Sequence, residues 1–120
     1  MQEIEARRID TMKTIKFRPA LARLILDGKK TTTWRLFDDK DLQMGDVVEL
    51  MNWETKEVFG RAVVTEVVEK PIKALDDHDW EGHERFSDEA AMYAAYRVYY
   101  LDKKIGPDTL VKILHFTLQV

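Results

Sequence analysis

The chain has 120 residues and a formal net charge of −3, with 45% hydrophobic and 34% charged residues. This balance is typical of one globular domain and excludes a disordered chain. There is no cysteine, which excludes disulfide bonds, thiolate catalysis and cysteine-ligated zinc. No apolar stretch reaches the length of a membrane span, and the N-terminus lacks the apolar core of a secretory signal. We therefore expect a cytoplasmic protein without a membrane partner.

Charge is distributed unevenly along the chain. Residues 1–35 carry nine Lys or Arg against four Asp or Glu, whereas residues 36–120 carry ten against eighteen. The basic excess at the N-terminal end suits a surface that meets a phosphate or another anion. A solvated surface of uneven composition explains the same counts, so both interpretations stay open.

The first elements follow a polar start. Residues 1–11 are polar and aperiodic, which predicts an N-terminal tail and leaves a single domain over residues 12–120. Residues 14–17 predict a short strand. Pro19 then suits the first turn of a helix, where its missing N–H costs nothing.

This first helix has a clear apolar spacing. Leu21, Leu24, Ile25 and Gly28 recur at i, i+3, i+4 and i+7, which predicts one buried face. Gly28 suits the C-terminal cap because a glycine takes a positive φ without a side-chain clash.

Strands dominate the rest of the chain. Runs rich in β-branched and aromatic residues predict strands at 31–36, 47–51, 58–68 and 110–120. Gly60, inside the third of these runs, predicts a bulge or a close backbone approach.

A second helix is expected late in the chain. Residues 71–86 are acidic and predict an irregular loop, after which Ser87 reads as an N-cap. The helix is expected to end near Leu101. The residues predicted to share its buried face are Met92, Ala95, Tyr96 and Tyr99. We therefore predict an α+β fold, a small barrel of five or six strands flanked by two helices.

The segment from Gly28 to Arg35 concentrates three complementary chemical groups. A threonine hydroxyl becomes a nucleophile when a base takes its proton, and Lys30 serves as that base once burial or neighbouring cations make it neutral. An acid is then needed for a departing amine. The loop that follows the third strand offers several carboxylates for this role: Asp76, Asp77, Asp79, Glu81 and Glu84. Together these groups describe acyl transfer without a metal.

Each of these residues also has a purely structural interpretation. A lysine after a helix end often stabilises the helix dipole in solvent, and threonines follow from strand propensity. Trp34 suits core packing as well as stacking on a base. The four metal-like residues in the acidic loop match no helical pair of histidines. They are His78, Asp79, His83 and Glu84. We predict no metal and no other cofactor.

The motif resembles a known family. A G-x-K-x-x-T-x-R pattern falls on Gly28, Lys30, Thr33 and Arg35 after a predicted helix, and a Gly45-Asp46 turn follows. In this order of elements, residues 12–120 resemble the ASCH domain of the PUA-like superfamily. The resemblance implies a small β-barrel with a cleft, and relatives that act on or bind RNA or modified nucleosides.

One branch of that family consists of N(4)-acetylcytidine amidohydrolases, which use a Lys, a Thr and a Glu. By motif position the resemblance implies Lys30 as base and Thr33 as nucleophile. Glu81 and Glu84 both qualify as the acid. Arg35 would hold the base carbonyl or stabilise an oxyanion.

We expect a monomer whose partner is RNA or a modified nucleoside, with amide hydrolysis of an acylated cytidine as the first hypothesis. A non-catalytic RNA-binding module and a ribonuclease that uses the same cleft are the alternatives. The residues expected to contact substrate or RNA are Arg23, Gly28, Lys29, Trp34 and Arg35.

Overall fold

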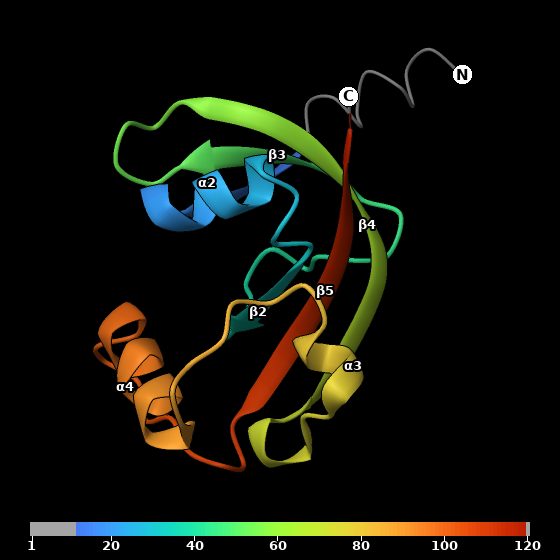
Figure 1. Ribbon diagram of the computed structural model, residues 1–120. Helices are drawn as coiled ribbons and strands as arrows, with labels where there is room; N and C mark the ends of the chain where they lie inside the picture. Colours follow the sequence, from blue (N-terminus) through green and yellow to red (C-terminus); the bar gives the residue numbers. More distant parts are fainter. Residues whose placement is uncertain (1–11, 120) are drawn as a thin grey trace.

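One curved five-stranded sheet forms the body of the molecule (Figure 1). The computed structural model describes residues 12–119. The strands are β1 Lys13–Phe17, β2 Thr32–Leu36, β3 Val47–Asn52, β4 Val58–Pro71 and β5 Leu110–Gln119. They lie in the order β1-β3-β4-β5-β2, with β1 parallel to β3 and every other pair antiparallel. The sheet curls into a half-barrel, which confirms the predicted α+β class. The tail predicted at residues 1–11 lies outside the described residues.

The two edge strands of the sheet do not pair with each other. β1 pairs with β3 and β2 pairs with β5, so the curl leaves an opening between β1 and β2. Side chains cross this opening instead of backbone bonds. Arg35 Nη2 on β2 donates to the Lys16 carbonyl on β1 over 2.9 Å, and Lys40 Nζ donates to the Thr14 carbonyl over 2.6 Å.

Helix α2, Pro19–Leu26, begins with its proline in the first turn, as predicted. Its fully buried residues are Ala22 and Ile25, whereas Leu21 and Leu24 are only half-buried and Gly28 is exposed. The predicted face was therefore partly wrong, because this eight-residue helix turns its Ala22 side to the sheet. Gly28 has φ +76° just beyond the helix end and serves as the predicted cap.

The acidic segment from residue 71 to 86 is more regular than predicted. β4 continues to Pro71, and the 3-10 helix η1, Ile72–Ala74, and the helix α3, Asp77–Trp80, follow. Asp76 caps α3 by accepting from the Asp79 N–H, and the Asp79 carboxylate accepts from the Asp76 N–H in return. This reciprocal capping box is built from two aspartates rather than the usual Ser/Thr and Glu. The predicted irregular loop was therefore wrong, and α3 adds a short third helix to the two that were predicted.

The predicted ends of helix α4, Glu89–Tyr99, differ slightly from those in the structure. Its N-cap is Asp88, whose carboxylate accepts from the Ala91 N–H over 2.8 Å, not Ser87. It ends at Tyr99 instead of near Leu101. The buried residues are Met92, Tyr93 and Tyr96, so Ala95 and Tyr99 do not belong to the buried face.

The bulge predicted at Gly60 is confirmed. The pairing of β3 with β4 shifts register between Leu50 and Met51, whose partners are Gly60 and Val58. The added methyl group of an alanine at position 60 would lie 3.4 Å from Leu118 Cδ1, which is an ordinary contact, so the bulge and not a close approach explains this glycine.

The apolar core is divided into two clusters. One lies beneath α2 and includes Ile25 of that helix, and the other lies beneath α4 and includes Tyr96. β5 contributes to both, with Leu114 in the first and Ile113 in the second, because its alternate residues point to opposite faces. Within residues 12–119, no helix has the length and apolar character that a bilayer crossing requires.

The loop after α3 is fastened to the start of β2. The Gly82 carbonyl accepts from the Thr31 N–H over 2.8 Å and from the Thr32 N–H over 3.1 Å. Gly82 has φ +73°, and a Cβ placed there would lie 2.0 Å from Thr31 Oγ1. Only glycine therefore allows this loop to lie against the strand.

We expect Gly82→Ala to lower the free energy of unfolding by about 1–3 kcal/mol, because it adds a left-handed alanine and a steric clash. Gly106→Ala is the matched control, since the added Cβ meets nothing within 4 Å and φ there is not positive. Urea unfolding of both variants checks this. Equal stability of the two would contradict the fastening of the loop by Gly82.

Candidate active site

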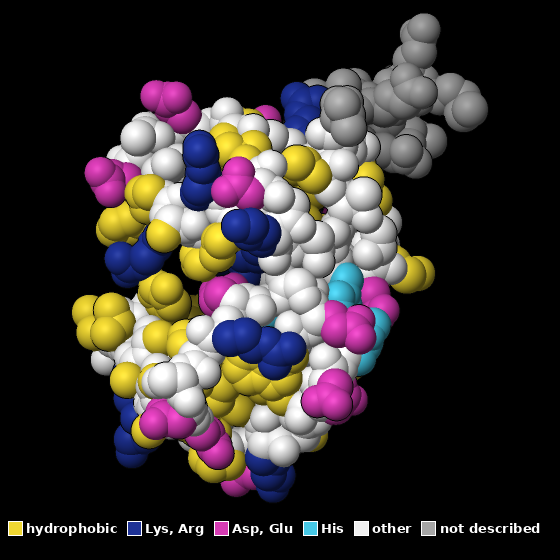
Figure 2. Space-filling view, in the orientation of Figure 1, with side chains coloured by type: hydrophobic (Ala, Val, Ile, Leu, Met, Phe, Trp, Pro, Cys, Tyr) yellow, Lys and Arg dark blue, Asp and Glu magenta, His cyan; other side chains and the backbone are white. Residues whose placement is uncertain are grey.

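A cleft of about 580 Å³ opens between the part of the molecule that carries α2 and the part that carries α4. Figure 2 shows this hollow at the left, bordered by hydrophobic and basic side chains. It lies at the opening between the edge strands β1 and β2. The lining residues used below are Arg18, Thr33, Arg35, His83, Glu84 and Tyr99.

Lys30 is buried behind this cleft and does not itself line it. The residue is 2% exposed, and its Nζ donates to the Thr32 carbonyl over 2.7 Å and to Glu84 Oε1 in a short ion pair. The positive φ of Gly28 turns the chain after α2, so Lys29 stays exposed while Lys30 enters the interior. Burial lowers the pKa of the Lys30 amine, and the Arg35 charge acts in the same direction against the opposing effect of Glu84.

Glu84 connects Lys30 with the cleft. Its side chain is 21% exposed, and the structure brings it to the lining. Burial alone would raise the pKa of its carboxyl group, but the Lys30 charge, the neighbouring His83 and the hydrogen bond from Lys30 together outweigh burial and lower this pKa. Glu84 is thus an ionisable group that touches both the buried amine and the space open to a ligand.

Thr33 and Arg35 lie two residues apart on β2 and both reach the cleft. Thr33 is 5% exposed. The Arg35 guanidinium lies 5.1 Å from the centre of the Phe17 ring, and its Nε is buried without a hydrogen-bond partner among the described residues. Burial lowers the pKa of Arg35. A buried N–H without a partner is uncommon and favours a hydrogen-bond acceptor at this position.

His83 is a cleft residue that the sequence did not assign to this site. Its ring stacks on Trp34 with centroids 3.9 Å apart, and its Nδ1–H donates to the Glu84 carbonyl over 2.8 Å. Burial, followed by the Lys30 charge, lowers the pKa of His83 to about 4. The imidazole is therefore neutral at pH 7. Its position beside Glu84 in sequence was the only available signal, and the stacking partner could not be known.

An aromatic and basic group forms the mouth of the cleft. The Arg18 guanidinium lies 5.2 Å from the Trp53 ring centre and 4.9 Å from that of Tyr99. Both rings are exposed, at 50% and 43%. They come from the β3–β4 hairpin and from the end of α4, so sequence spacing gave no sign of their meeting. We call these three residues the mouth cluster.

Other residues predicted for the site lie elsewhere. The Glu81 side chain is 70% exposed and faces His78, with Glu81 Oε2 lying 3.3 Å from His78 Nδ1. Arg23 is exposed and pairs with Asp27, and Lys29 and Gly28 are exposed outside the lining. Trp34 borders the cleft, but it is 4% exposed and its Nε1 donates to the Asp79 carbonyl.

The four residues of the acidic loop with metal-like side chains do not converge. His83 and Glu84 face the cleft, whereas Asp79 pairs with Lys70 over 2.7 Å. His78 turns toward a different part of the sheet.

Taken together, the cleft holds a hydroxyl, a carboxylate that is paired with a buried amine, a neutral imidazole and a partly unpaired guanidinium. These groups share one cleft, and a hydroxyl becomes a nucleophile where a neighbouring group accepts its proton. The guanidinium adds a positive charge to the same cleft.

The overall architecture matches solved structures of ASCH domains. The ASCH domain from Lactobacillus crispatus JV V101 has a TM-score of 0.66 at 20% identity, covering 89% of this chain and 79% of that one. The ASCH protein from Zymomonas mobilis has a TM-score of 0.61 at 19% identity, covering 87% of this chain and 65% of that one. A protein of the DUF984 family from Enterococcus faecalis V583 has a TM-score of 0.66 at 16% identity, covering 83% and 67%.

The chain therefore has the fold of an ASCH domain, as the sequence motif predicted. No protein-family model matches the sequence, and no curated protein matches it at a significant level. At these identities the similarity establishes the fold alone, and the chemistry has to be argued from the cleft.

The burial of His83 has a measurable consequence. The unfolded imidazole has a pKa of 6.5 and the folded one about 4, so the unfolded state binds more protons between these values. We expect the free energy of unfolding to fall by about 3 kcal/mol between pH 6.5 and 4 because of this residue. His83→Phe, which keeps a ring on Trp34, should lose that pH-dependent part in urea unfolding. An NMR titration in which His83 titrates near 6.5 would contradict the burial.

Proposed function

We propose that the protein hydrolyses the amide bond of an acylated cytidine, with N(4)-acetylcytidine as the simplest substrate. The observation that carries this proposal is the buried Lys30–Glu84 pair next to the cleft that Thr33 lines. The ASCH fold and the matching motif positions support it. Thr33 and the mouth cluster line the same cleft, and the exposed rings of that cluster are available for stacking on a nucleoside base.

The pair can exist in two forms that differ by the position of one proton. The lowered pKa of Glu84 favours ammonium and carboxylate at rest. Transfer of the proton to Glu84 gives a neutral Lys30 amine, which is the reactive form, and burial lowers the cost of this uncharged pair. Lys30 then takes the Thr33 proton while the Thr33 oxygen attacks the acyl carbonyl. Glu84 gives its proton to the amine nitrogen as the C–N bond breaks, which releases cytidine. The pair is left as ammonium and carboxylate beside an acyl-threonine.

The second half of the cycle restores the enzyme. The proton returns from Lys30 to Glu84, and Lys30 takes a proton from a water molecule that attacks the acyl ester. The Thr33 oxygen leaves and takes a proton from Lys30, and the carboxylic acid departs, which restores the neutral amine and the protonated Glu84. Arg35 stabilises the negative carbonyl oxygen in both halves, and neutral His83 holds the backbone of Glu84 in place.

Substitutions at Thr33 test the nucleophile with the least disturbance. Thr33→Val keeps the shape of the buried side chain and removes the hydroxyl, so it should abolish release of cytidine from N(4)-acetylcytidine. Thr33→Ser retains a hydroxyl and should keep measurable turnover. Chromatographic detection of cytidine measures both. Equal activity of Thr33→Val and the wild type would refute the proposal.

The same assay shows which of the two carboxylates considered from the sequence, Glu81 or Glu84, acts as the acid. We expect Glu84→Gln and Lys30→Met to lower kcat by about 10²–10⁴-fold, the range of lost acid–base catalysis. Glu81→Gln is the matched control and should keep the wild-type rate, because its side chain faces away from the cleft. Circular dichroism verifies that each variant is folded. A loss at Glu81 with full activity at Glu84 would reverse the assignment.

The mouth cluster favours RNA as a second candidate ligand, with or without chemistry. An arginine between two exposed rings offers a phosphate contact and surfaces for unpaired bases. Binding of single-stranded RNA should weaken steeply with salt, since phosphate contacts release counterions. Cleaved RNA with a cyclic phosphate end would instead identify a ribonuclease.

We expect Trp53→Ala to weaken RNA binding by about 1–3 kcal/mol, which is the contribution of one stacked base. Phe37→Ala is the matched control, because Phe37 is 45% exposed but lies outside the cleft. Fluorescence anisotropy at two salt concentrations measures both. If neither the salt concentration nor the Trp53 substitution changes the affinity, the mouth cluster is excluded as the RNA-binding surface.

A further inference from the structure

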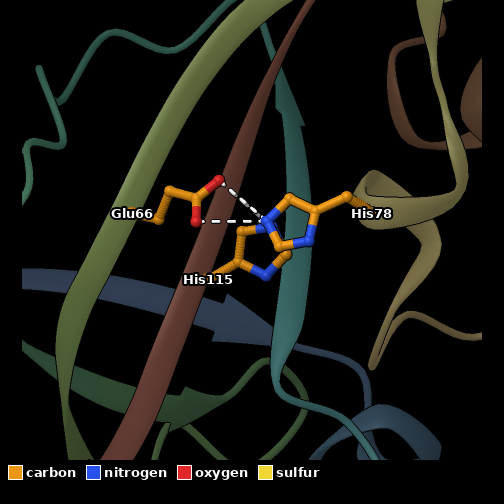
Figure 3. A group of neighbouring side chains, drawn as sticks. All are labelled: Glu66, His78 and His115. Carbon is orange, nitrogen blue, oxygen red and sulfur yellow. Dashed lines mark hydrogen bonds and ion pairs between the residues drawn. The ribbon is translucent and has the colours of Figure 1, made fainter.

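Three side chains converge on the sheet away from the cleft. Glu66 of β4, His78 of α3 and His115 of β5 each offer one potential ligand atom around a common point, and these atoms lie within 4.8 Å of one another (Figure 3). None of the three lines the cleft. Because they come from three separate elements, neither sequence spacing nor the motif indicated the cluster.

His115 presents an unused lone pair to this point. Its Nδ1 lies 2.9 Å from Thr32 Oγ1, and the Thr32 hydroxyl donates its own hydrogen to the Glu81 carbonyl. Thr32 therefore accepts from His115, which places the ring proton on Nδ1. Nε2 is then unprotonated, buried and without a hydrogen-bond partner among residues 12–119, at 3.9 Å from Glu66 Oε2. A buried acceptor without a donor calls for an electropositive ligand.

His78 differs from His115 because each of its ring nitrogens already faces a carboxylate, so a metal ion would replace the proton on its Nε2. Its Nδ1 lies 3.3 Å from Glu81 Oε2, and its Nε2 lies 3.0 and 3.1 Å from the two oxygens of Glu66. A carboxylate on the outer nitrogen of an imidazole orients the ring and strengthens the inner nitrogen as a metal ligand. Glu81 thus supports both histidines, through its side chain at His78 and through its carbonyl and Thr32 at His115.

The donor set is that of a zinc site with an open position. Two imidazoles and one glutamate bind Zn²⁺ at about 2.0–2.2 Å and leave a fourth site for water. Ligand atoms of such a tetrahedron are roughly 3.4 Å apart, and the observed separations of 3.0 and 3.9 Å from Glu66 lie on either side of that value.

One side chain has to move for this geometry. The rings of His78 and His115 are stacked with centroids 4.6 Å apart, so their lone pairs do not yet meet at one point. His78 is 53% exposed on the four-residue helix α3, which leaves room for its ring to turn. An ion pair of His78 with Glu66 alone would leave the buried His115 Nε2 unused.

We propose that Glu66, His78 and His115 bind a divalent transition-metal ion, zinc in the first place. The site fastens α3 to β4 and β5 and lies across β2 from the candidate active site. Thr32 is shared between the two, because its hydroxyl holds His115 while its carbonyl accepts from Lys30. The cleft chemistry does not use the metal, so the two proposals stand or fall separately.

Isothermal titration with Zn²⁺, on protein first treated with a chelator, tests the site. We expect one ion per chain and a dissociation constant at least about tenfold larger for His78→Ala and for His115→Ala. Thr32→Val, which removes the partner of His115 Nδ1, should weaken binding about 10–100-fold. Glu69→Gln, an exposed carboxylate on the same strand, is the matched control and should bind as the wild type does.

Two further measurements make the outcome decisive. Zinc should raise the thermal unfolding midpoint of the wild type but not of His78→Ala. Because the His78 side chain is exposed in the wild type, its loss is expected to disturb folding least. Mg²⁺ should neither bind nor compete, since imidazole ligands suit zinc. Absence of zinc binding to the folded wild type would overturn the proposal, as would equal affinity in the wild type and His78→Ala.

Discussion

The architecture of this domain depends on one ion pair, the contact of the buried Lys30 ammonium with Glu84. An ammonium taken out of water loses several kcal/mol of solvation unless a partner restores it. Here the partner comes from a loop 54 residues away, and the Thr32 carbonyl supplies a second acceptor. The pair therefore requires that the turn at Gly28 point inward and that the loop at Gly82 lie on β2. Loss of either glycine conformation would leave a charge buried without compensation.

The half-barrel leaves an open edge through which a ligand can approach this buried pair. In a closed barrel β1 and β2 would pair with each other, whereas in this sheet each keeps one edge without a neighbouring strand. Arg35 spans the opening through the Lys16 carbonyl and keeps one N–H free. The two apolar clusters stabilise the halves on either side, so the opening persists as a cleft. Reactive groups can thus be both desolvated and reachable, which acid–base chemistry requires.

The sequence predicted those features that depend on local patterns. Strand periodicity, Pro19 and the Gly28 cap located most elements, and the motif placed Lys30 and Thr33 near one cleft because both lie on a short segment. It could not choose between Glu81 and Glu84, since only two residues separate the exposed side chain of Glu81 from the partly buried one of Glu84. Asp76 and Asp79 were read as loop because an aspartate capping box resembles an acidic run. The mouth cluster and His115 depend on tertiary contacts between distant segments, which carry no local signal.

The alternation of β2 relates the two proposed sites. Thr33 and Arg35 face the cleft, while the Thr32 hydroxyl faces the opposite side, where it bonds His115 and the Glu81 carbonyl. The backbone of the same loop residue pair, Glu81 and Gly82, is thus bound by Thr32 from two directions, and Glu84 follows two residues later. An ion at His115 would restrain this loop from behind. A more rigid loop holds the Glu84 carboxylate at a fixed distance from the Lys30 amine. A metal ion on the His115 side of β2 would therefore affect the geometry of the cleft on the other side, without any change of fold.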